Sequence, residues 1–106
     1  MKQITPQELK QMLDTVPEPP VLLDVREDRE VAICRIPGSV HIPMGQITAE
    51  LSQLQVEAPL VAICHHGARS YQVAMYLEQQ GFTDVYNLQG GIERWACDID
   101  PEMPRY

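Results

Sequence analysis

Short apolar runs alternate with amphipathic segments along the whole chain. Four of these runs are strand-like, and they lie at 21–23, 40–42, 60–63 and 84–88. The run 60–63 has no polar alternation, which is typical of a strand buried on both faces of a sheet. Segments with helical spacing separate the runs. This alternation predicts an α/β fold with a mostly parallel sheet and helices on both of its faces.

The first predicted helix has a clear start and a clear stop. Thr5 is placed to cap it, Pro6 occupies the first helical position, and Glu8 can reach back to complete a capping box. The helix is expected to end near Asp14, because three prolines follow within six residues of that position.

Further segments also have helical character. The segment 28–32 is compatible with a helix, and apolar residues at helical spacing predict an amphipathic helix over 47–54. A longer helix is predicted over 70–80, with Ser70 as its N-cap and a glycine stop at Gly81. Trp95, after a glycine pair that lets the chain turn, is expected to anchor the core.

The stretch from Leu60 to Gly81 carries the most chemistry. Cys64 follows the apolar run, so it is expected at the carboxyl end of a buried strand, just before a helix. Backbone N–H groups at a helix start form a positive hollow that accepts anions, and this hollow favours the reactive thiolate form of a cysteine. Arg69 adds a cation. Cys64 is therefore the candidate nucleophile, and the alternative is an inert cysteine buried in the core.

Size and composition limit the possible classes of protein. The 106 residues, 44% of them hydrophobic and 22% charged, predict one compact domain over 1–106. No signal peptide and no apolar run of membrane-spanning length are found, so the expected location is the cytoplasm. Three cysteines without framework spacing indicate reduced thiols.

The chain is acidic, with a formal net charge of -7. This charge disfavours binding to nucleic acid or to an anionic membrane surface. An anionic ligand would have to be attracted by the hollow at Cys64 and by Arg69 alone.

The histidines do not predict a metal site. His65 and His66 are adjacent on a tight loop and should point in different directions, while His41 and Cys97 stand alone. We therefore expect no metal and no cofactor. The imidazoles of His65 and His66 could tune the thiolate or select the acceptor, or they could be ordinary surface residues.

Four motifs in the same order and spacing resemble the rhodanese-like family. They are Leu22–Glu27, Ile36–Pro43, Cys64–Ser70, and Gln89–Ile92 with Trp95. The resemblance covers nearly the whole chain. It implies a three-layer α/β domain around a central, mainly parallel five-stranded sheet, with an active-site loop whose first residue is a cysteine that carries sulfur as a persulfide.

The resemblance also implies an activity. The sulfurtransferase branch of the family has a six-residue loop, and Cys64 to Arg69 is six residues. Related phosphatases and arsenate reductases have one residue more, so sulfur transfer is favoured over these alternatives. A second alternative is a non-catalytic interaction or regulatory module, but such domains typically lack the loop cysteine.

One segment departs from the family pattern. Cys34 and Arg35 precede Ile36-Pro37-Gly38, where the family often has glycine followed by histidine. Cys34 could be a second, resolving thiol or an incidental cysteine.

The expected reaction is a double displacement. The Cys64 thiolate attacks the outer sulfur of a small anionic donor such as thiosulfate, sulfite departs, and the persulfide passes its sulfur to a thiol or protein acceptor. Backbone N–H groups of the loop are expected to surround that sulfur. They belong to His65, His66, Gly67, Ala68, Arg69 and Ser70.

The charged residues near the loop have two possible roles. Arg69 could attract the donor's sulfonate, or it could form a salt bridge with Asp24 or Glu27 that holds the loop. Asp24 and Arg26 are expected to brace the loop from the neighbouring strand end.

Overall fold

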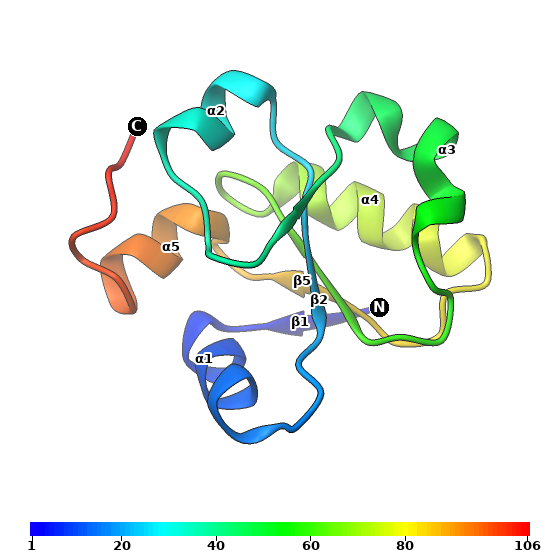
Figure 1. Ribbon diagram of the computed structural model, residues 1–106, viewed down its shortest axis with the longest axis horizontal. Coiled ribbons are helices and arrows are strands. Elements are labelled where there is room, and N and C mark those ends of the chain that lie inside the picture. Colours follow the sequence, from blue (N-terminus) through cyan, green and yellow to red (C-terminus); the bar gives the residue numbers. More distant parts are fainter.

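A single parallel sheet of five strands forms the centre of the computed structural model, which describes residues 1–106 (Figure 1). The strands are β1 (Lys2–Ile4), β2 (Val21–Asp24), β3 (Val40–His41), β4 (Leu60–Ile63) and β5 (Val85–Leu88). Their order is β1-β5-β4-β2-β3, and every pairing is parallel. The predicted α/β fold with a parallel five-stranded sheet is confirmed, and β4 lies in its middle.

Helices cover both faces of the sheet. They are α1 (Pro6–Thr15), α2 (Asp28–Ile33), α3 (Ile47–Glu50), α4 (Ala68–Gln79) and α5 (Gly91–Asp98). Side chains of α1 and α5 pack into one core, and those of α3 and α4 pack into the other. The three-layer arrangement is therefore the one that the sequence predicted. None of these helices is long and apolar enough to cross a membrane.

The two cores are separated by the alternation of side chains along β4. Val61 and Ile63 point into one core, whereas Leu60, Ala62 and Cys64 point into the other. Cys64 therefore faces α4. Cys34 packs on the opposite face of the sheet, in the core that contains Val61.

The strand β1 was not predicted as an element from the sequence pattern. It has only three residues, and Ile4 is the one that is buried. β1 pairs with β5 at the edge of the sheet, where Lys2 lies opposite Tyr86. A strand this short gives almost no periodic signal, so only its pairing defines it.

The start of α4 corrects a prediction. Ser70 was expected to be the N-cap, but the helix begins at Ala68 and its N-cap is Gly67. Gly67 has φ of +106°, a left-handed conformation that residues with a Cβ rarely adopt, and this turn brings the chain into the helix early. The predicted stop is confirmed, because the Phe82 N–H bonds to the Leu77 carbonyl across Gly81.

Two other helix predictions have different outcomes. The capping box of Thr5 and Glu8 is present at the start of α1. The single amphipathic helix expected over 47–54 is instead one turn of α-helix, α3, between two short 3-10 turns at Met44–Gln46 and Leu51–Gln53. Ile47 alone is fully buried there, so little apolar contact is available to extend a regular helix.

Candidate active site

Cys64 lies immediately after β4, beneath the start of α4. Its sulfur accepts a hydrogen bond from the Gly67 N–H at 3.0 Å, and the hydroxyl oxygen of Ser70 lies 3.3 Å away. Six backbone N–H groups were expected around the sulfur, and the structure has a hydrogen bond to it from one of them, the N–H of Gly67. The residue is only 1% exposed. The thiol is therefore buried, with two polar groups beside it at the N-terminus of α4.

Ser70 connects this sulfur to the neighbouring strand. Its hydroxyl also bonds to Oδ1 of Asn87 on β5, and the amide of Asn87 donates to the Gly67 carbonyl at 3.2 Å. A hydroxyl has a single proton, so Ser70 donates either to Asn87 or to Cys64 at one time. When Cys64 is ionised, its sulfur can only accept, and the Ser70 proton then stabilises the negative charge.

The first turn of α5 holds the other side of the loop. The N–H of Ile92 donates to the Cys64 carbonyl at 2.9 Å, and the N–H of Glu93 donates to the His65 carbonyl at 3.1 Å. A Cβ on Gly91 would lie less than 3.0 Å from both carbonyl oxygens. Glycine at this position is therefore what allows α5 to approach the backbone of the loop.

Arg69 is held by a carboxylate that the sequence analysis did not identify. Its two terminal nitrogens bond to the two oxygens of Glu30 on α2, at 2.7 and 2.9 Å. The partner expected from the sequence was Asp24 or Glu27, and that prediction is wrong because the first turn of α2 turns Glu30 toward the loop. Hydrogen bonds from Arg69 hold the pKa of Glu30 well below its usual range, although burial opposes this.

Asp24 and Arg26 form a salt bridge that is almost completely buried, with 2.7 Å between Arg26 Nη2 and Asp24 Oδ2. The guanidinium also donates to the Cys34 carbonyl at 2.7 Å and to the Tyr106 hydroxyl at 3.1 Å. Burial by itself would lower the pKa of Arg26, but the bonds to Asp24 and Tyr106 outweigh it and raise the pKa. Asp24 and Arg26 therefore brace the end of α2 and the C-terminal tail. Their connection to the cysteine loop is indirect, because Arg26 bonds to Tyr106, Tyr106 bonds to Glu30, and Glu30 holds Arg69.

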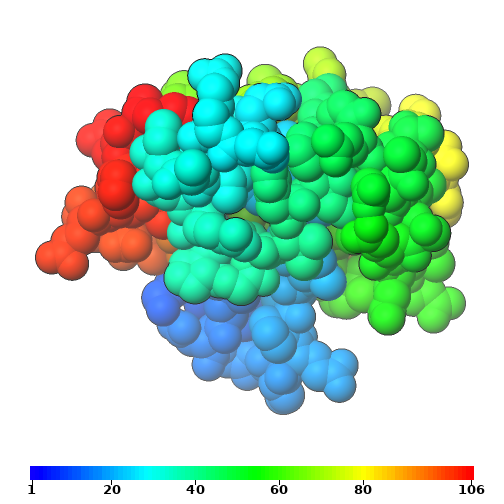
Figure 2. Space-filling view, turned by 45° about the horizontal axis from the view of Figure 1, so that its top comes forward, coloured from blue at the N-terminus to red at the C-terminus, as the bar shows by residue number.

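Tyr106 belongs to the site, although no sequence pattern indicated it. The C-terminal tail runs beside α2, as the red and cyan segments show in two views (Figures 1 and 2). The Tyr106 hydroxyl donates to Oε2 of Glu30 at 2.7 Å. Burial raises the pKa of Tyr106 to about 12, while Arg26 opposes the shift. The phenol therefore remains a neutral donor between Arg26 and Glu30.

The side chains of His65 and His66 were expected to point in different directions, but their rings stack on one another, and His65 also stacks on Tyr106. The ring of His65 lies 3.9 Å from the ring of His66 on one side and 3.9 Å from that of Tyr106 on the other, between centroids. Burial, with a smaller contribution from His66, lowers the pKa of His65. Nε2 of His65 is buried without a hydrogen-bond partner. The stack therefore favours the neutral imidazole at position 65.

Comparison with known proteins identifies this arrangement of strand, cysteine loop and helix. A family model described as rhodanese-like domain matches residues 5–98. The chain belongs to the rhodanese-like family. Its four sequence motifs are thereby explained, and the resemblance seen in the sequence is confirmed.

Relatives of this rhodanese-like chain include sulfurtransferases. The chain is 40% identical over 102 residues to the protein YtwF of Bacillus subtilis, covering 96% of this chain and 97% of that protein. It is 35% identical over 94 residues to the thiosulfate sulfurtransferase GlpE of Pseudomonas aeruginosa, covering 89% and 83%. The crystal structure of SSP1007 from Staphylococcus saprophyticus superimposes with a TM-score of 0.85 at 36% identity, covering 93% and 97%.

A hollow of about 420 Å³ opens beside the cysteine loop of this rhodanese-like domain. No aspartate, glutamate, lysine or arginine lines it. Its walls are formed by Gln3, His66, Gly67, Ala68, Tyr71, Gln72, Asn87, Gln89 and Gly90. His66 and Ala68, both predicted site residues, are exposed here and form its rim on the loop side. No group of three or more histidine, cysteine, aspartate or glutamate side chains is placed to hold a metal ion.

Proposed function

We propose that this protein is a sulfurtransferase that moves sulfane sulfur from a small donor, such as thiosulfate, to a thiophilic acceptor through a persulfide on Cys64. The observation that carries the proposal is the contact of the Cys64 sulfur with the Gly67 N–H at 3.0 Å and the Ser70 hydroxyl at 3.3 Å. These two donors favour a thiolate at the N-terminus of a 12-residue helix.

The first half-reaction forms the persulfide. The Cys64 thiolate attacks the outer sulfur of thiosulfate, a new S–S bond forms at Cys64, and the S–S bond of the donor breaks. Sulfite leaves with both electrons of that bond. The product, a Cys64 persulfide anion, has the same single negative charge as the thiolate that it replaces, so the donors of the loop serve both states.

The second half-reaction releases the sulfur. A nucleophilic acceptor, such as a thiolate or a protein cysteine, attacks the terminal sulfur, and Cys64 departs as the thiolate. The same helix N-terminus that favours the thiolate makes it a good leaving group in this step. No metal or cofactor is needed for either half of the cycle.

Access to the thiol requires a change in the loop. Cys64 is 1% exposed, and we propose that a donor reaches its sulfur when the segment 66–68 shifts. This segment is exposed or half-buried and borders the open hollow beside the loop. We propose that the hollow admits the donor and then the acceptor.

Mass spectrometry of the intact protein tests the proposal. After incubation with thiosulfate, the wild type is expected to gain the mass of one sulfur atom on Cys64, and a thiol acceptor should remove it. Cys64→Ser should gain nothing, while Cys34→Ser and Cys97→Ser should behave as the wild type does. A wild type that stays unmodified with thiosulfate and with persulfide donors would refute the proposal, as would turnover of an aryl phosphate or of arsenate without a persulfide.

A further inference from the structure

The positive charge nearest to the cysteine loop is already neutralised within the protein. Both oxygens of Glu30 are bound by Arg69, in a two-pronged ion pair of 2.7 and 2.9 Å. This pair uses Nη1 and Nη2 of the guanidinium, so the charge of Arg69 is balanced by a carboxylate on one edge while Nε lies on another. The ion pair with Glu30 therefore weakens the attraction of Arg69 for a donor's sulfonate.

Glu30 cannot easily release Arg69, because the carboxylate is fixed by two other donors. The Glu27 N–H bonds to Oε1 at 3.0 Å, and the Tyr106 hydroxyl bonds to Oε2 at 2.7 Å. The side chain of Glu30 is only 7% exposed. Rotating it away from Arg69 would break these bonds and leave a buried carboxylate without partners, which is costly.

The charges around the loop cancel one another. Asp24 and Glu30 contribute two negative charges, Arg26 and Arg69 contribute two positive charges, and Tyr106 joins the two pairs as a neutral phenol. The adjacent hollow has no aspartate, glutamate, lysine or arginine in its walls. The attraction left for an anion is the partial charge of the α4 N-terminus, about half an elementary charge, within a chain of net charge -7.

We infer that Glu30 is a positioning residue that selects the donor of the proposed sulfur transfer. By holding Arg69, it biases Cys64 toward sulfane donors with at most one negative charge, of the class of alkyl persulfides, and against doubly charged thiosulfate. With a persulfide RS–SH, the Cys64 thiolate attacks the outer sulfur and the donor's S–S bond breaks. RS⁻ leaves and takes up the proton of the transferred sulfur, so the products are the Cys64 persulfide anion and RSH.

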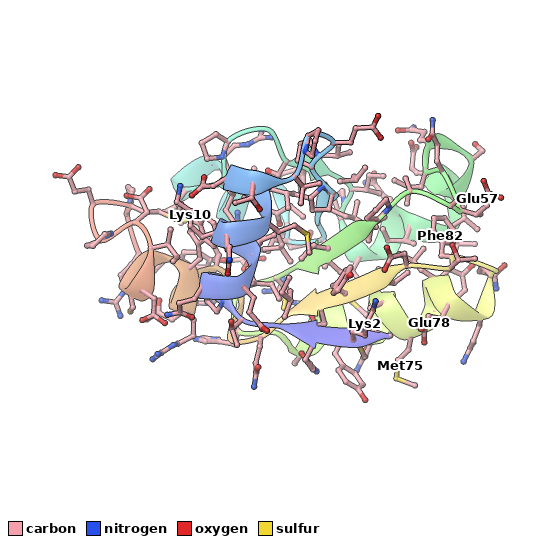
Figure 3. All side chains as sticks on the ribbon, turned by 90° about the horizontal axis from the view of Figure 1, so that it is seen from below. Lys2, Lys10, Glu57, Met75, Glu78 and Phe82 are labelled. Carbon is pink, nitrogen blue, oxygen red and sulfur yellow. The ribbon has the colours of Figure 1, made fainter.

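The test compares two donors on three proteins. The rate of persulfide formation on Cys64 is measured with thiosulfate and with an alkyl persulfide that has an uncharged alkyl group and is generated in situ, for the wild type, Glu30→Gln and Glu57→Gln. Glu57 is exposed and lies at the other end of the molecule from the C-terminal tail (Figure 3), so its substitution removes the same charge far from the loop.

Glu30→Gln is expected to raise the ratio of the thiosulfate rate to the persulfide rate about tenfold, because it releases a cation beside the thiol. Glu57→Gln should change the ratio by less than about twofold, since distant exposed charges are screened. In the double variant Glu30→Gln with Arg69→Gln, the ratio of the thiosulfate rate to the persulfide rate should return to the wild-type value. A merely structural role of Glu30 would slow both donors alike and leave the ratio unchanged.

An unchanged ratio in Glu30→Gln, or a gain that persists in the double variant, overturns the inference. If Glu30→Gln does not fold, Glu30→Asp replaces it. The shorter side chain loosens the ion pair with Arg69, so we expect a smaller rise in the ratio of the two rates. The absence of any rise in this variant also overturns the inference. The inference rests on the proposed function, but the two fail differently. Absence of a persulfide with either donor refutes sulfur transfer itself, whereas persulfide formation without a shift in the ratio refutes only the role of Glu30.

Discussion

The hydroxyl of Tyr106 lies 2.7 Å from Glu30 Oε2, although the two residues are 76 positions apart in the sequence. This contact attaches the C-terminal tail to α2. Because Glu30 in turn holds Arg69 on α4, three segments that are distant in the chain fix one side of the cysteine loop. The tail is therefore part of the site.

Removing the Tyr106 hydroxyl should weaken this attachment. Tyr106→Phe keeps the ring that stacks on His65 but leaves Arg26 and Glu30 with one hydrogen bond fewer each. We expect the free energy of unfolding to fall by about 1 kcal/mol, measured by urea denaturation. Tyr106→Ala should cost more, because it also removes the stack. Equal stability of the wild type and Tyr106→Phe would show that the hydroxyl contributes nothing.

Ser70→Ala should slow the formation of the persulfide. The substitution removes one of the two donors near the Cys64 sulfur and leaves Asn87 Oδ1 without its bond to the hydroxyl. We expect a rate loss on the order of tenfold, smaller than the loss of a dedicated oxyanion donor, because the Gly67 N–H remains. Single-turnover kinetics with mass detection measures this rate. The control is Ser52→Ala, at an exposed position, and identical rates for the two variants would contradict the role of Ser70.

Gly91→Ala should displace the cysteine loop. The added Cβ would meet the carbonyl oxygens of Cys64 and His65, and φ at this position is +62°. Gly81→Ala is the matched control, because φ there is +97° and the Cβ would meet nothing. The control is expected to lose about 1 kcal/mol of stability from backbone strain alone. Gly91→Ala should lose more and should also change the rate of Cys64 alkylation; similar effects of both substitutions would exclude a steric role for Gly91.

Acid should destabilise the fold through His65. Burial lowers the pKa of His65 in the folded state below its ordinary value of 6.5. The unfolded chain therefore binds more protons just below pH 6.5, so this residue's contribution to stability is present above that pH and is lost as the pH falls below it. Urea denaturation between pH 5.5 and 7.5 measures the slope. His65→Gln should flatten it, His66→Gln should reduce it less, and an unchanged slope in His65→Gln would assign the effect to other groups.

Part of the site was readable from the sequence because it is local. Cys64, the glycine that ends its loop and the helix that follows occupy one continuous stretch, and the apolar run before them indicates a buried strand end. Alternate residues of a strand face opposite sides of the sheet, and this alternation along β4 places Cys64 on the side of α4. The same local logic misplaced the helix start at Ser70, because the left-handed turn at Gly67 was not recognised as the N-cap.

The partners of the loop were not readable in this way. Asn87 is a polar residue in a buried strand, which is an unusual position and could have marked it. Glu30 and Tyr106 gave no such signal. An acidic residue in the first turn of a helix is common, and a tyrosine after two prolines has no periodicity to interpret.

The sequence by itself determined the fold class, the position of Cys64 at a strand end and the family, because strand and helix periodicity and a contiguous loop are encoded by neighbouring residues. The tertiary structure decided which carboxylate holds Arg69, which strand orients Ser70 and which residues the C-terminal tail contacts. These are contacts between residues far apart in the chain, and they depend on how the packed layers bring the ends of separate elements together. No local pattern contains that information.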